Sequence, residues 1–357
     1  MPGDPEIKFM RRCLGLAAKA EGMTYPNPMV GAVVVHKGAI IGEGFHLKAG
    51  GPHAEVNAIN SVADRSLLGD STLYVNLEPC CHFGKTPPCT DIILSHRIKR
   101  VVAGTVDTSE NVSGKGMATL QNGGCEVVAG VLEEECRRLN RRFFTFHEKK
   151  RPYVVLKWAQ SADGFLDTER TDCMPSKPVW ITGNAERVLV HRWRSFEQTI
   201  LVGAETIRKD NPRLNVREWV GNDPVRLILS NSGLIDKESL IFKISGTNIV
   251  FLRNTVTDTG KALKVVLNDN ESSAKQITDY LFVRGIQSLL VEGGAKVLEH
   301  FISEGLWDEA RIFSGIPCFR KGMKAPVISG TLITKIRFSR STLQIVLNSG
   351  SQHLMGY

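Results

Sequence analysis

Short apolar runs alternate with segments of helical periodicity along the first 150 residues of the chain. Runs such as Val33-Val34-Val35 and Leu73-Tyr74-Val75 lie between glycines and helical stretches, which is typical of strands in a largely buried sheet. The pattern predicts helices over 5–21, 53–63, 88–96, 115–121 and 131–145, and strands near 30–36, 39–44, 72–77, 99–104 and 125–129. This half is therefore predicted to form an α/β sandwich.

A basic run followed by a proline, at residues 149–152, ends the last of these helices and predicts a domain boundary. A strand-like run over 153–159 follows at once and leads into a turn at 161–164. Three further elements continue the pattern, a helix ending near Arg194 and strands over 198–202 and 287–291. A new sheet is expected to begin directly after the boundary.

Two domains are predicted, over 1–150 and 151–357. A chain of 357 residues is long for a single core and suits two domains of ordinary size. Residues 231–285 carry few signals beyond short β-like runs such as 248–252, and the tail after Gly330 resembles closing strands. No chemistry is assigned to that tail.

The composition is that of a globular protein, with 42% hydrophobic and 23% charged residues. No apolar run approaches the roughly 18 residues of a membrane span, and the start of the chain lacks the basic and apolar segments of a signal peptide. We expect a soluble cytoplasmic enzyme without a membrane partner. Of the eight cysteines, three cluster around a proline-rich loop, which favours metal binding over disulfides.

The net charge of +8 raises the question of a nucleic-acid partner. The first 150 residues carry 18 Lys and Arg against 16 Asp and Glu, so most of the excess belongs to the second half. Aromatic side chains that could stack on bases are sparse near the candidate motifs. We therefore expect a small-molecule substrate and no nucleic acid.

Three short motifs have the residue types of a catalytic zinc site. His53-Ala54-Glu55, Pro79-Cys80 and Cys89 supply one imidazole and two thiolates, and a catalytic zinc keeps three protein ligands and leaves the fourth position for water. Two thiolates and a neutral imidazole leave the site formally neutral, so the metal needs help from a base. Glu55, near a predicted helix start, is the candidate for moving the proton from water to a departing amine. The motifs predict a deaminase.

Two other interpretations of these motifs stay open. A structural zinc would need a fourth protein ligand, for which Cys81 is available, and the chain could then be a zinc-stabilised scaffold protein. A nucleic-acid or nucleoside deaminase with an appended domain is the other. The usual nucleobase-deaminase signature separates its two cysteines by two residues, whereas eight separate Cys80 from Cys89.

Longer stretches resemble one family. The run 76–89, the run 25–34 and the Gly-Phe-His and Gly-Pro-His-Ala-Glu stretches within 42–55 closely resemble the deaminase half of the bifunctional riboflavin-biosynthesis deaminase/reductase. The segments 161–164, 180–183, 203–217 and 292–294 resemble its reductase half. The resemblance implies an α/β protein with an N-terminal cytidine-deaminase-like three-layer sandwich and a C-terminal dihydrofolate-reductase-like domain.

The resemblance also implies the chemistry. A zinc-dependent hydrolase half would deaminate 2,5-diamino-6-(5-phosphoribosylamino)pyrimidin-4-one, and an NADPH-dependent oxidoreductase half would then reduce the ribosyl to a ribityl side chain. Zn²⁺ and NADPH are the implied cofactors, and a homo-oligomer is the implied assembly. Hydride transfer depends mainly on positioning the nicotinamide and the acceptor carbon.

In the deaminase half, the resemblance places three further residues near the substrate. Asn27 is implied for the pyrimidine pocket, although a turn residue between two prolines is the plain alternative. His46 is implied to contact substrate, against an ordinary strand-end histidine. Lys85 or His82 could reach the substrate phosphate, against a solvated loop tip.

In the reductase half, the resemblance divides the implied residues into two groups. The cofactor and substrate cleft is implied to contain Ala159, Trp180, Thr206 and Asp210. The substrate and its phosphate are implied to contact Arg194, Leu214, Arg217 and Glu292. Guanidinium groups suit a terminal phosphate, and salt bridges are their alternative role.

A glycine pair and one proline are further features of this half. Gly293 and Gly294 end a predicted strand at a helix start, where backbone N–H groups suit a cofactor phosphate, although a tight turn would explain them as well. Pro178 stands where the family usually has a serine, two residues before Trp180. Proline offers neither a hydroxyl nor an N–H, so one substrate contact is missing unless Ser176 or Lys177 replaces it.

Overall fold

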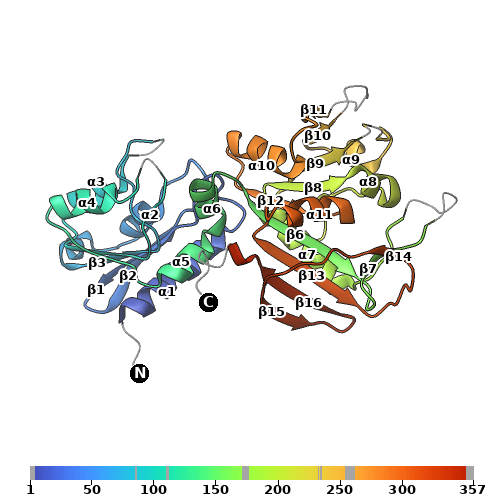
Figure 1. Ribbon diagram of the computed structural model, residues 1–357. Coiled ribbons are helices and arrows are strands. Elements are labelled where there is room, and N and C mark those ends of the chain that lie inside the picture. Colours follow the sequence, from blue (N-terminus) through green and yellow to red (C-terminus); the bar gives the residue numbers. More distant parts are fainter. Residues whose placement is uncertain are drawn as a thin grey trace. The chain divides into compact units, whose positions relative to one another are not determined.

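The computed structural model describes residues 5–84, 87–109, 112–170, 177–231, 233, 235–253 and 262–350. They form two compact units that divide between Lys149 and Lys150, and each unit is described by itself (Figure 1). Within the described ranges, no helix has both the length and the apolar character needed to cross a membrane.

The first unit is built on a five-stranded sheet in the order β2-β1-β3-β4-β5. β1 pairs antiparallel with β2 and β3, and β3, β4 and β5 are parallel. The strands are β1 (Gly31–His36), β2 (Ala39–Phe45), β3 (Thr72–Val75), β4 (Arg100–Ala103) and β5 (Glu126–Ala129). The helices are α1 (Pro5–Ala17), α2 (Ala54–Asn60), α3 (Cys89–Ser95), α4 (Lys115–Asn122), α5 (Glu133–Leu139) and α6 (Arg141–Lys149).

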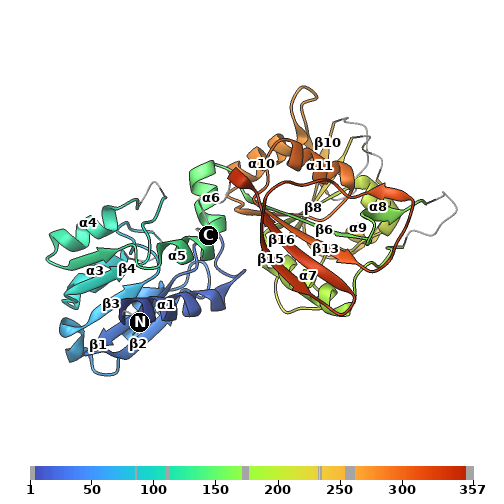
Figure 2. The same ribbon diagram turned by 60° about the horizontal axis from the view of Figure 1, so that its bottom comes forward.

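Helices cover both faces of this sheet. Phe9, Met10 and Cys13 of α1 pack with Cys136 of α5 on the face that carries Val33. The opposite face packs against α2, α3 and α4 through a second cluster that contains Val34, Ile59, Ile93 and Leu120. Because alternate residues of a strand point to opposite faces, the continuous run 33–35 fits a sheet buried on both sides. The predicted three-layer sandwich is confirmed (Figure 2).

Two glycines bring α2 close to β2 and so place the start of that helix. A Cβ at Gly42 would lie 2.5 Å from the Ala58 carbonyl oxygen, and one at Gly44 would lie 2.5 Å from the Ala58 nitrogen. Only a residue without a side chain allows this approach. The Gly-x-Gly spacing of β2 thus fixes the depth of the helix that carries Glu55.

The helix predicted over 131–145 is in fact two helices, α5 and α6. Asn140 lies between them, and its side-chain amide is bonded to the backbone of Met29: Met29 N–H donates to Asn140 Oδ1 at 2.7 Å, and Asn140 Nδ2 donates to the Met29 carbonyl at 2.9 Å. The helix predicted over 5–21 also ends earlier, at Ala17, and continues as the 3₁₀ turn Ala18–Ala20. A further 3₁₀ turn, Arg65–Asp70, was not predicted.

The second unit contains a nine-stranded sheet in the order β11-β10-β9-β8-β12-β6-β13-β16-β15, and a two-stranded sheet of β14 and β7. Strands β11 to β13 in that order are parallel, and β16 and β15 close the sheet antiparallel. The strands are β6 (Tyr153–Gln160), β7 (Phe165–Thr168), β8 (Thr199–Gly203), β9 (Val225–Ser230), β10 (Asn248–Leu252), β11 (Leu263–Val266), β12 (Ser288–Val291), β13 (Glu309–Gly315), β14 (Gly322–Lys324), β15 (Thr331–Arg337) and β16 (Ser341–Leu347).

Five helices accompany this sheet: α7 (Asn184–Phe196), α8 (Ala204–Asp210), α9 (Leu240–Lys243), α10 (Ser273–Val283) and α11 (Ala295–Ser303). α10 and α11 pack on one face through Leu281 and Phe301. α7 packs on the other face, where Trp193 meets Phe313. The closing strands after Gly330 and the strands over 198–202 and 287–291 are confirmed within a residue or two, and the poorly predicted stretch 231–285 contributes β10, β11 and α10.

Candidate active sites

Three potential ligand atoms of the zinc motifs converge in the first unit. His53 Nδ1 lies 3.4 Å from Cys80 Sγ and 3.3 Å from Cys89 Sγ, and the three atoms all lie within 4.8 Å of one another. Zinc–sulfur and zinc–nitrogen bonds of about 2.3 and 2.0 Å at tetrahedral angles would separate nitrogen and sulfur by about 3.5 Å. Among the described residues, the donor set consists of these three atoms, which fits a zinc ion with three protein ligands.

Two helix starts and one loop position these atoms. His53 is the N-cap of α2, and Cys89 is the first residue of α3. Cys80 precedes α3, where its sulfur accepts the Cys89 N–H at 3.4 Å and its carbonyl accepts the Thr90 N–H at 3.2 Å. The N-terminus of α3 therefore favours negative charge on Cys80, as predicted for thiolate ligands.

The hydrogen bond between Cys80 and Cys89 shifts the pKa values of the two thiols in opposite directions. The hydrogen bond with Cys89 lowers the pKa of Cys80 to about 4 and, together with burial, raises the pKa of Cys89. The pKa of His53 is raised by the hydrogen bond between its imidazole and Cys80, although burial opposes this shift. Because zinc binds thiolates and neutral imidazole, loading the site must release protons.

Glu55 lies beside these three residues, in the first turn of α2. Its side chain is 3% exposed, and burial raises its pKa to about 7, with the Cys80 charge adding to the effect. Its carboxyl group is hydrogen-bonded to Cys89. A carboxyl group whose pKa lies near neutrality can both accept and return a proton, which suits a general base that later acts as an acid.

Asn27 and His46 lie beside the zinc ligands. Asn27 Nδ2 lies 3.0 Å from His46 Nε2, and His46 Nδ1 lies 3.0 Å from the Pro52 carbonyl oxygen. Since a carbonyl only accepts, Nδ1 carries the proton and Nε2 accepts from Asn27. Burial lowers the pKa of His46, which favours this neutral form. The His46 and His53 rings meet edge to face with centroids 5.4 Å apart, so the two predicted substrate residues border the metal site.

In the second unit, Arg194 and Glu292 form a buried two-point ion pair. Arg194 Nε and Nη2 donate to the two Glu292 oxygens at 2.8 and 2.7 Å, and Lys157 Nζ lies 3.8 Å from Oε2. Burial opposes ionisation of Glu292, but Arg194 and Lys157 outweigh it and lower its pKa to about 2. The ion pair that was the alternative role of Arg194 is therefore present.

Arg217 has a different surrounding. Its Nε lies 3.8 Å from Glu218 Oε1, while Arg187 Nε contacts the other oxygen of that carboxylate at 2.7 Å. Burial and the charge of Arg194 lower the pKa of Arg217, and burial with Arg194 and Arg217 lowers the pKa of His191 to about 4. Positive charge thus accumulates around Arg217, which is the electrostatic requirement for an anion site.

Thr206 and the Gly293-Gly294 pair are brought together at one end of the sheet. A Cβ at Gly293 would lie 3.1 Å from Thr206 Oγ1, and Gly294, with φ +73°, caps α11. A side chain at Gly293 would require Thr206 to shift by a few tenths of an ångström, and the positive φ of Gly294 favours glycine there. The three residues therefore lie close together, as a shared role in cofactor binding requires.

The other predicted reductase residues lie on separate elements. Ala159 is on β6 beside the α7 cluster, and Leu214 is buried with φ +56°. Trp180 is half-exposed, with the Arg187 guanidinium 5.3 Å from its ring centroid. Asp210 ends α8. Lys85 and Ser176 lie outside the described residues.

Two family models match the chain. The cytidine and deoxycytidylate deaminase zinc-binding region matches residues 4–105, and the RibD C-terminal domain matches residues 152–339, more than half of the chain. The chain belongs to the RibD family.

Relatives of known name match most of the chain's length. It is 41% identical to the riboflavin biosynthesis protein RibD of Aquifex aeolicus over 85% of each chain, and 39% identical to that of Bacillus amyloliquefaciens over 91% of this chain and 88% of the relative. The solved diaminohydroxyphosphoribosylaminopyrimidine deaminase/5-amino-6-(5-phosphoribosylamino)uracil reductase of Thermotoga maritima superposes with a TM-score of 0.87 at 39% identity, covering 96% of this chain and 99% of that one. Acinetobacter baumannii RibD gives 0.86 at 31% identity, covering 97% and 99%.

Membership of the RibD family confirms the predicted activities. The chain is a bifunctional deaminase and reductase of riboflavin biosynthesis, and Zn²⁺ and NADPH are its implied cofactors. The nucleic-acid or nucleoside deaminase is not favoured. An enzyme with both halves also leaves the scaffold interpretation without support.

The sequence did not reveal the role of Glu78 in this RibD chain. Glu78 holds the loop that carries Cys80, called the zinc loop below. The Glu78 carboxylate is buried and accepts four backbone N–H groups, from Asp107, Gly114, Gly116 and Met117, at 2.8–3.1 Å. A Cβ at Gly116 would lie 2.0 Å from the Pro79 carbonyl oxygen. The position two residues before Cys80 was the available signal, but partners 29 or more residues away along the chain cannot be read from it.

Two buried amides of the RibD deaminase half were also missed. Gly31 N–H donates to Asn76 Oδ1 at 2.7 Å, and Asn76 Nδ2 donates to the Met29 carbonyl at 3.1 Å. Asn140 donates to the same Met29 carbonyl and also accepts the Met29 N–H. Together the two amides hold the backbone that follows Asn27. Lys157 was missed in the reductase half, because an alternating strand pattern does not reveal which residue faces Glu292.

Proposed function

We propose that His53, Cys80 and Cys89 hold the catalytic zinc and that Glu55 is the proton carrier of the deaminase half. The convergence of three donor atoms beside one buried carboxyl group carries this proposal. When bound, zinc(II) lowers the pKa of water and supplies a nucleophile at neutral pH. A Glu55 carboxylate oxygen takes a proton from that water and returns it to the departing amine, so water and the amino-bearing carbon give a carbonyl and ammonia.

Asn27 and His46 orient the pyrimidine in this proposal. His46 donates to the Pro52 carbonyl and accepts from Asn27, which fixes the amide so that its carbonyl oxygen is presented away from the imidazole. A held side chain loses less freedom when substrate binds. Lys85 contributes to binding of the substrate phosphate.

For the reductase half, we propose that Arg217 binds the substrate phosphate and that Leu214, Arg194 and Glu292 shape the same pocket. Arg194 contributes to the pocket through its ion pair, because its Nε and Nη2 already donate to Glu292. Ala159, Trp180, Thr206, Asp210, Gly293 and Gly294 form the cofactor side. NADPH supplies the hydride that converts the ribosyl group, in its open form, to ribityl, and the protein contributes alignment.

The remaining proposals concern organisation. The deaminase domain is assigned to 1–150 and the reductase domain to 151–357, supported by the family matches over 4–105 and 152–339 and by the division of the units at Lys149. We also infer a cytoplasmic homo-oligomer from the family resemblance. Size-exclusion chromatography with light scattering tests the assembly.

One reaction tests the function as a whole. Zinc-loaded protein is mixed with 2,5-diamino-6-(5-phosphoribosylamino)pyrimidin-4-one and NADPH, and ammonia and NADPH absorbance are followed together. Ammonia that precedes NADPH oxidation supports both halves in the proposed order. Ammonia without NADPH oxidation would overturn the reductase assignment in this chain, where Pro178 departs from the family, and no ammonia would overturn the zinc assignment.

A further inference from the structure

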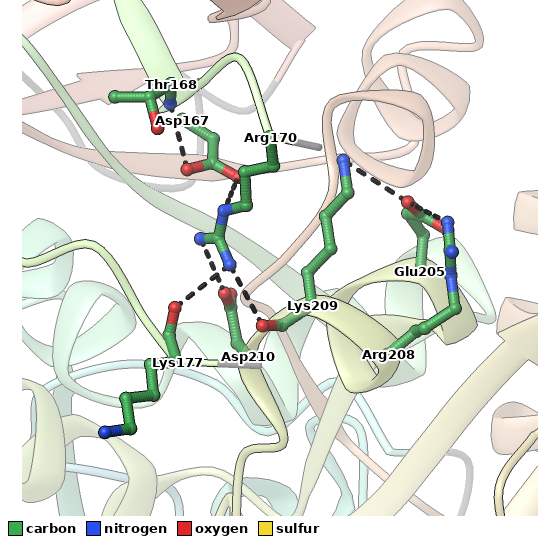
Figure 3. Close-up of polar contacts among 8 residues, drawn as sticks. All are labelled: Asp167, Thr168, Arg170, Lys177, Glu205, Arg208, Lys209 and Asp210. Carbon is green, nitrogen blue, oxygen red and sulfur yellow. Dashed lines mark hydrogen bonds and ion pairs between the residues drawn. The ribbon is translucent and has the colours of Figure 1, made fainter. Parts of the chain in front are cut away.

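Arg170, two residues beyond β7, joins three separate segments of the second unit. Nη1 donates to the Lys177 carbonyl and to the Lys209 carbonyl, both at 2.9 Å, and Nη2 donates to Asp210 Oδ1 at 3.0 Å. Nε lies 2.7 Å from Asp167 Oδ2, and the side chain is only 10% exposed. Figure 3 shows the guanidinium at the centre of these contacts, with carbonyl and carboxylate oxygens around its plane.

The C-terminal end of α8 favours a positively charged side chain beside it. The last carbonyls of a helix lack helical partners, and the helix dipole disfavours a carboxylate such as Asp210 there. Burial also raises the pKa of Asp210, and Arg170 opposes that effect. Because a guanidinium has five donors in a fixed plane, one side chain can donate to the Lys209 carbonyl and pair with the Asp210 carboxyl group.

The third segment contains Trp180. The Lys177 carbonyl that Arg170 holds lies three residues before this tryptophan, and Lys177 itself is restricted to an extended conformation because Pro178 follows it. Pro178 and Arg170 therefore limit the same short stretch, one through backbone sterics and the other through a hydrogen bond.

A neighbouring cluster on α8 provides a contrast. Glu205 pairs with Arg208 at 2.6 Å and with Lys209 Nζ at 3.3 Å, all within one helix and largely exposed (Figure 3). Such exposed pairs within one helix contribute little to stability. Arg170 differs because its own side chain is only 10% exposed and its partners come from three segments.

We propose that Arg170 is a positioning residue of the reductase half, which holds the Trp180 segment against the α8 end that carries Asp210, with Thr206 one turn earlier. The inference rests on the proposed function, in which those three residues form the cofactor side of the cleft. Arg170 acts through them. Its removal lets the Trp180 segment and the α8 end move apart on the cofactor side of the cleft, while the deaminase half is unaffected.

The test compares Arg170→Ala, Arg170→Lys and, as matched control, Arg208→Ala with the unsubstituted protein. Each is assayed for ammonia release, for kcat and for the KM of NADPH with 5-amino-6-(5-phosphoribosylamino)uracil, and for NADPH binding by its fluorescence. We expect Arg170→Ala to raise the KM and the dissociation constant for NADPH and to lower kcat/KM by about 10- to 100-fold. Ammonia release stays unchanged, and Arg208→Ala behaves as the unsubstituted protein.

Arg170→Lys separates charge from geometry. Lysine keeps the charge but cannot reach two carbonyls and Asp210 in one plane, so we expect it to remain impaired by at least about fivefold. Full activity in Arg170→Lys or Arg170→Ala overturns the proposal. So does an Arg170→Ala protein whose second unit unfolds, since the role would then be stability alone. Absence of NADPH oxidation in the unsubstituted protein would instead overturn the proposed reductase function.

Discussion

The two sites handle buried charge in opposite ways. In the deaminase half, one imidazole and two thiols lie together beside the buried Glu55 carboxyl group, and these groups shift one another's pKa values. In the reductase half, Arg194 is neutralised by a permanent pair with Glu292, whereas Arg217 shares one carboxylate with Arg187. Converging ligand atoms therefore indicate a metal site. An excess of cationic side chains over carboxylates indicates an anion site.

The largest effect is expected at Glu55. Glu55→Gln keeps the volume and leaves the three ligands in place but cannot move a proton, so ammonia release should fall about 10²- to 10⁴-fold. Metal analysis checks that zinc remains. Reduction of supplied 5-amino-6-(5-phosphoribosylamino)uracil by NADPH is the internal control and should not change; full ammonia release with zinc present would remove Glu55 from the mechanism.

Breaking the permanent ion pair should mainly affect stability. Arg194→Met leaves Lys157, at 3.8 Å, to balance the buried Glu292 carboxylate, so the loss should be at most about 3–5 kcal/mol, which is the cost of removing one partner of a buried pair. All five tryptophans follow residue 150, so tryptophan fluorescence during urea unfolding reports on the reductase half. An unchanged unfolding midpoint would show that Glu292 is not held as an ion by Arg194.

Arg217→Ala sharpens the contrast with Arg194. Removing a cation from a crowded positive region should leave stability nearly unchanged, while the KM of the phosphorylated uracil substrate rises about 10- to 100-fold, the worth of one charge-assisted pair. Steady-state kinetics of NADPH oxidation measures it, with the KM of NADPH as the control. A substrate KM that does not move would place the phosphate elsewhere.

On the deaminase side, Glu78→Gln tests how the zinc loop is held. The amide can present only one acceptor oxygen to the four N–H groups, so zinc affinity should fall about tenfold, within the 10- to 100-fold range of groups that support metal ligands. Competition with a chromogenic chelator measures the affinity. Glu148→Gln, in an exposed pair with Arg137, is a suitable control.

The last prediction concerns pH. His191 has a folded pKa of about 4 against an ordinary value of 6.5, so the unfolded chain binds the extra proton between these limits. Its contribution to stability is complete above pH 6.5 and is lost as the pH falls toward 4. His191→Gln should flatten the fluorescence-detected stability of the reductase half over that window; identical slopes would contradict the neutral assignment.

The metal site could be predicted from the sequence because zinc chemistry constrains residue type and spacing. His53, Glu55, Cys80 and Cys89 lie in short motifs, and their predicted positions at helix starts and in the preceding loop agree with the structure. The strands were predictable for a similar reason, since runs such as 33–35 are buried on both faces.

Other features depend on contacts between distant parts of the chain. Asn140 looks like an ordinary polar helix residue until Met29 is placed beside it, 111 positions earlier, and so the break between α5 and α6 was missed. Glu78 and Arg170 likewise obtain their roles from backbone groups of other segments. Local patterns carry no information about such partners.

The contact between Asn140 and Met29 bears on how the deaminase half is made. The matched zinc-binding region ends at residue 105, before Asn140 and before β5. On the ribosome, every predicted zinc ligand leaves the exit tunnel ahead of Asn140 and ahead of the four N–H donors to Glu78, which lie between Asp107 and Met117. A fragment cut at the end of the zinc-binding region should therefore bind zinc more weakly than the full chain and show no deaminase activity.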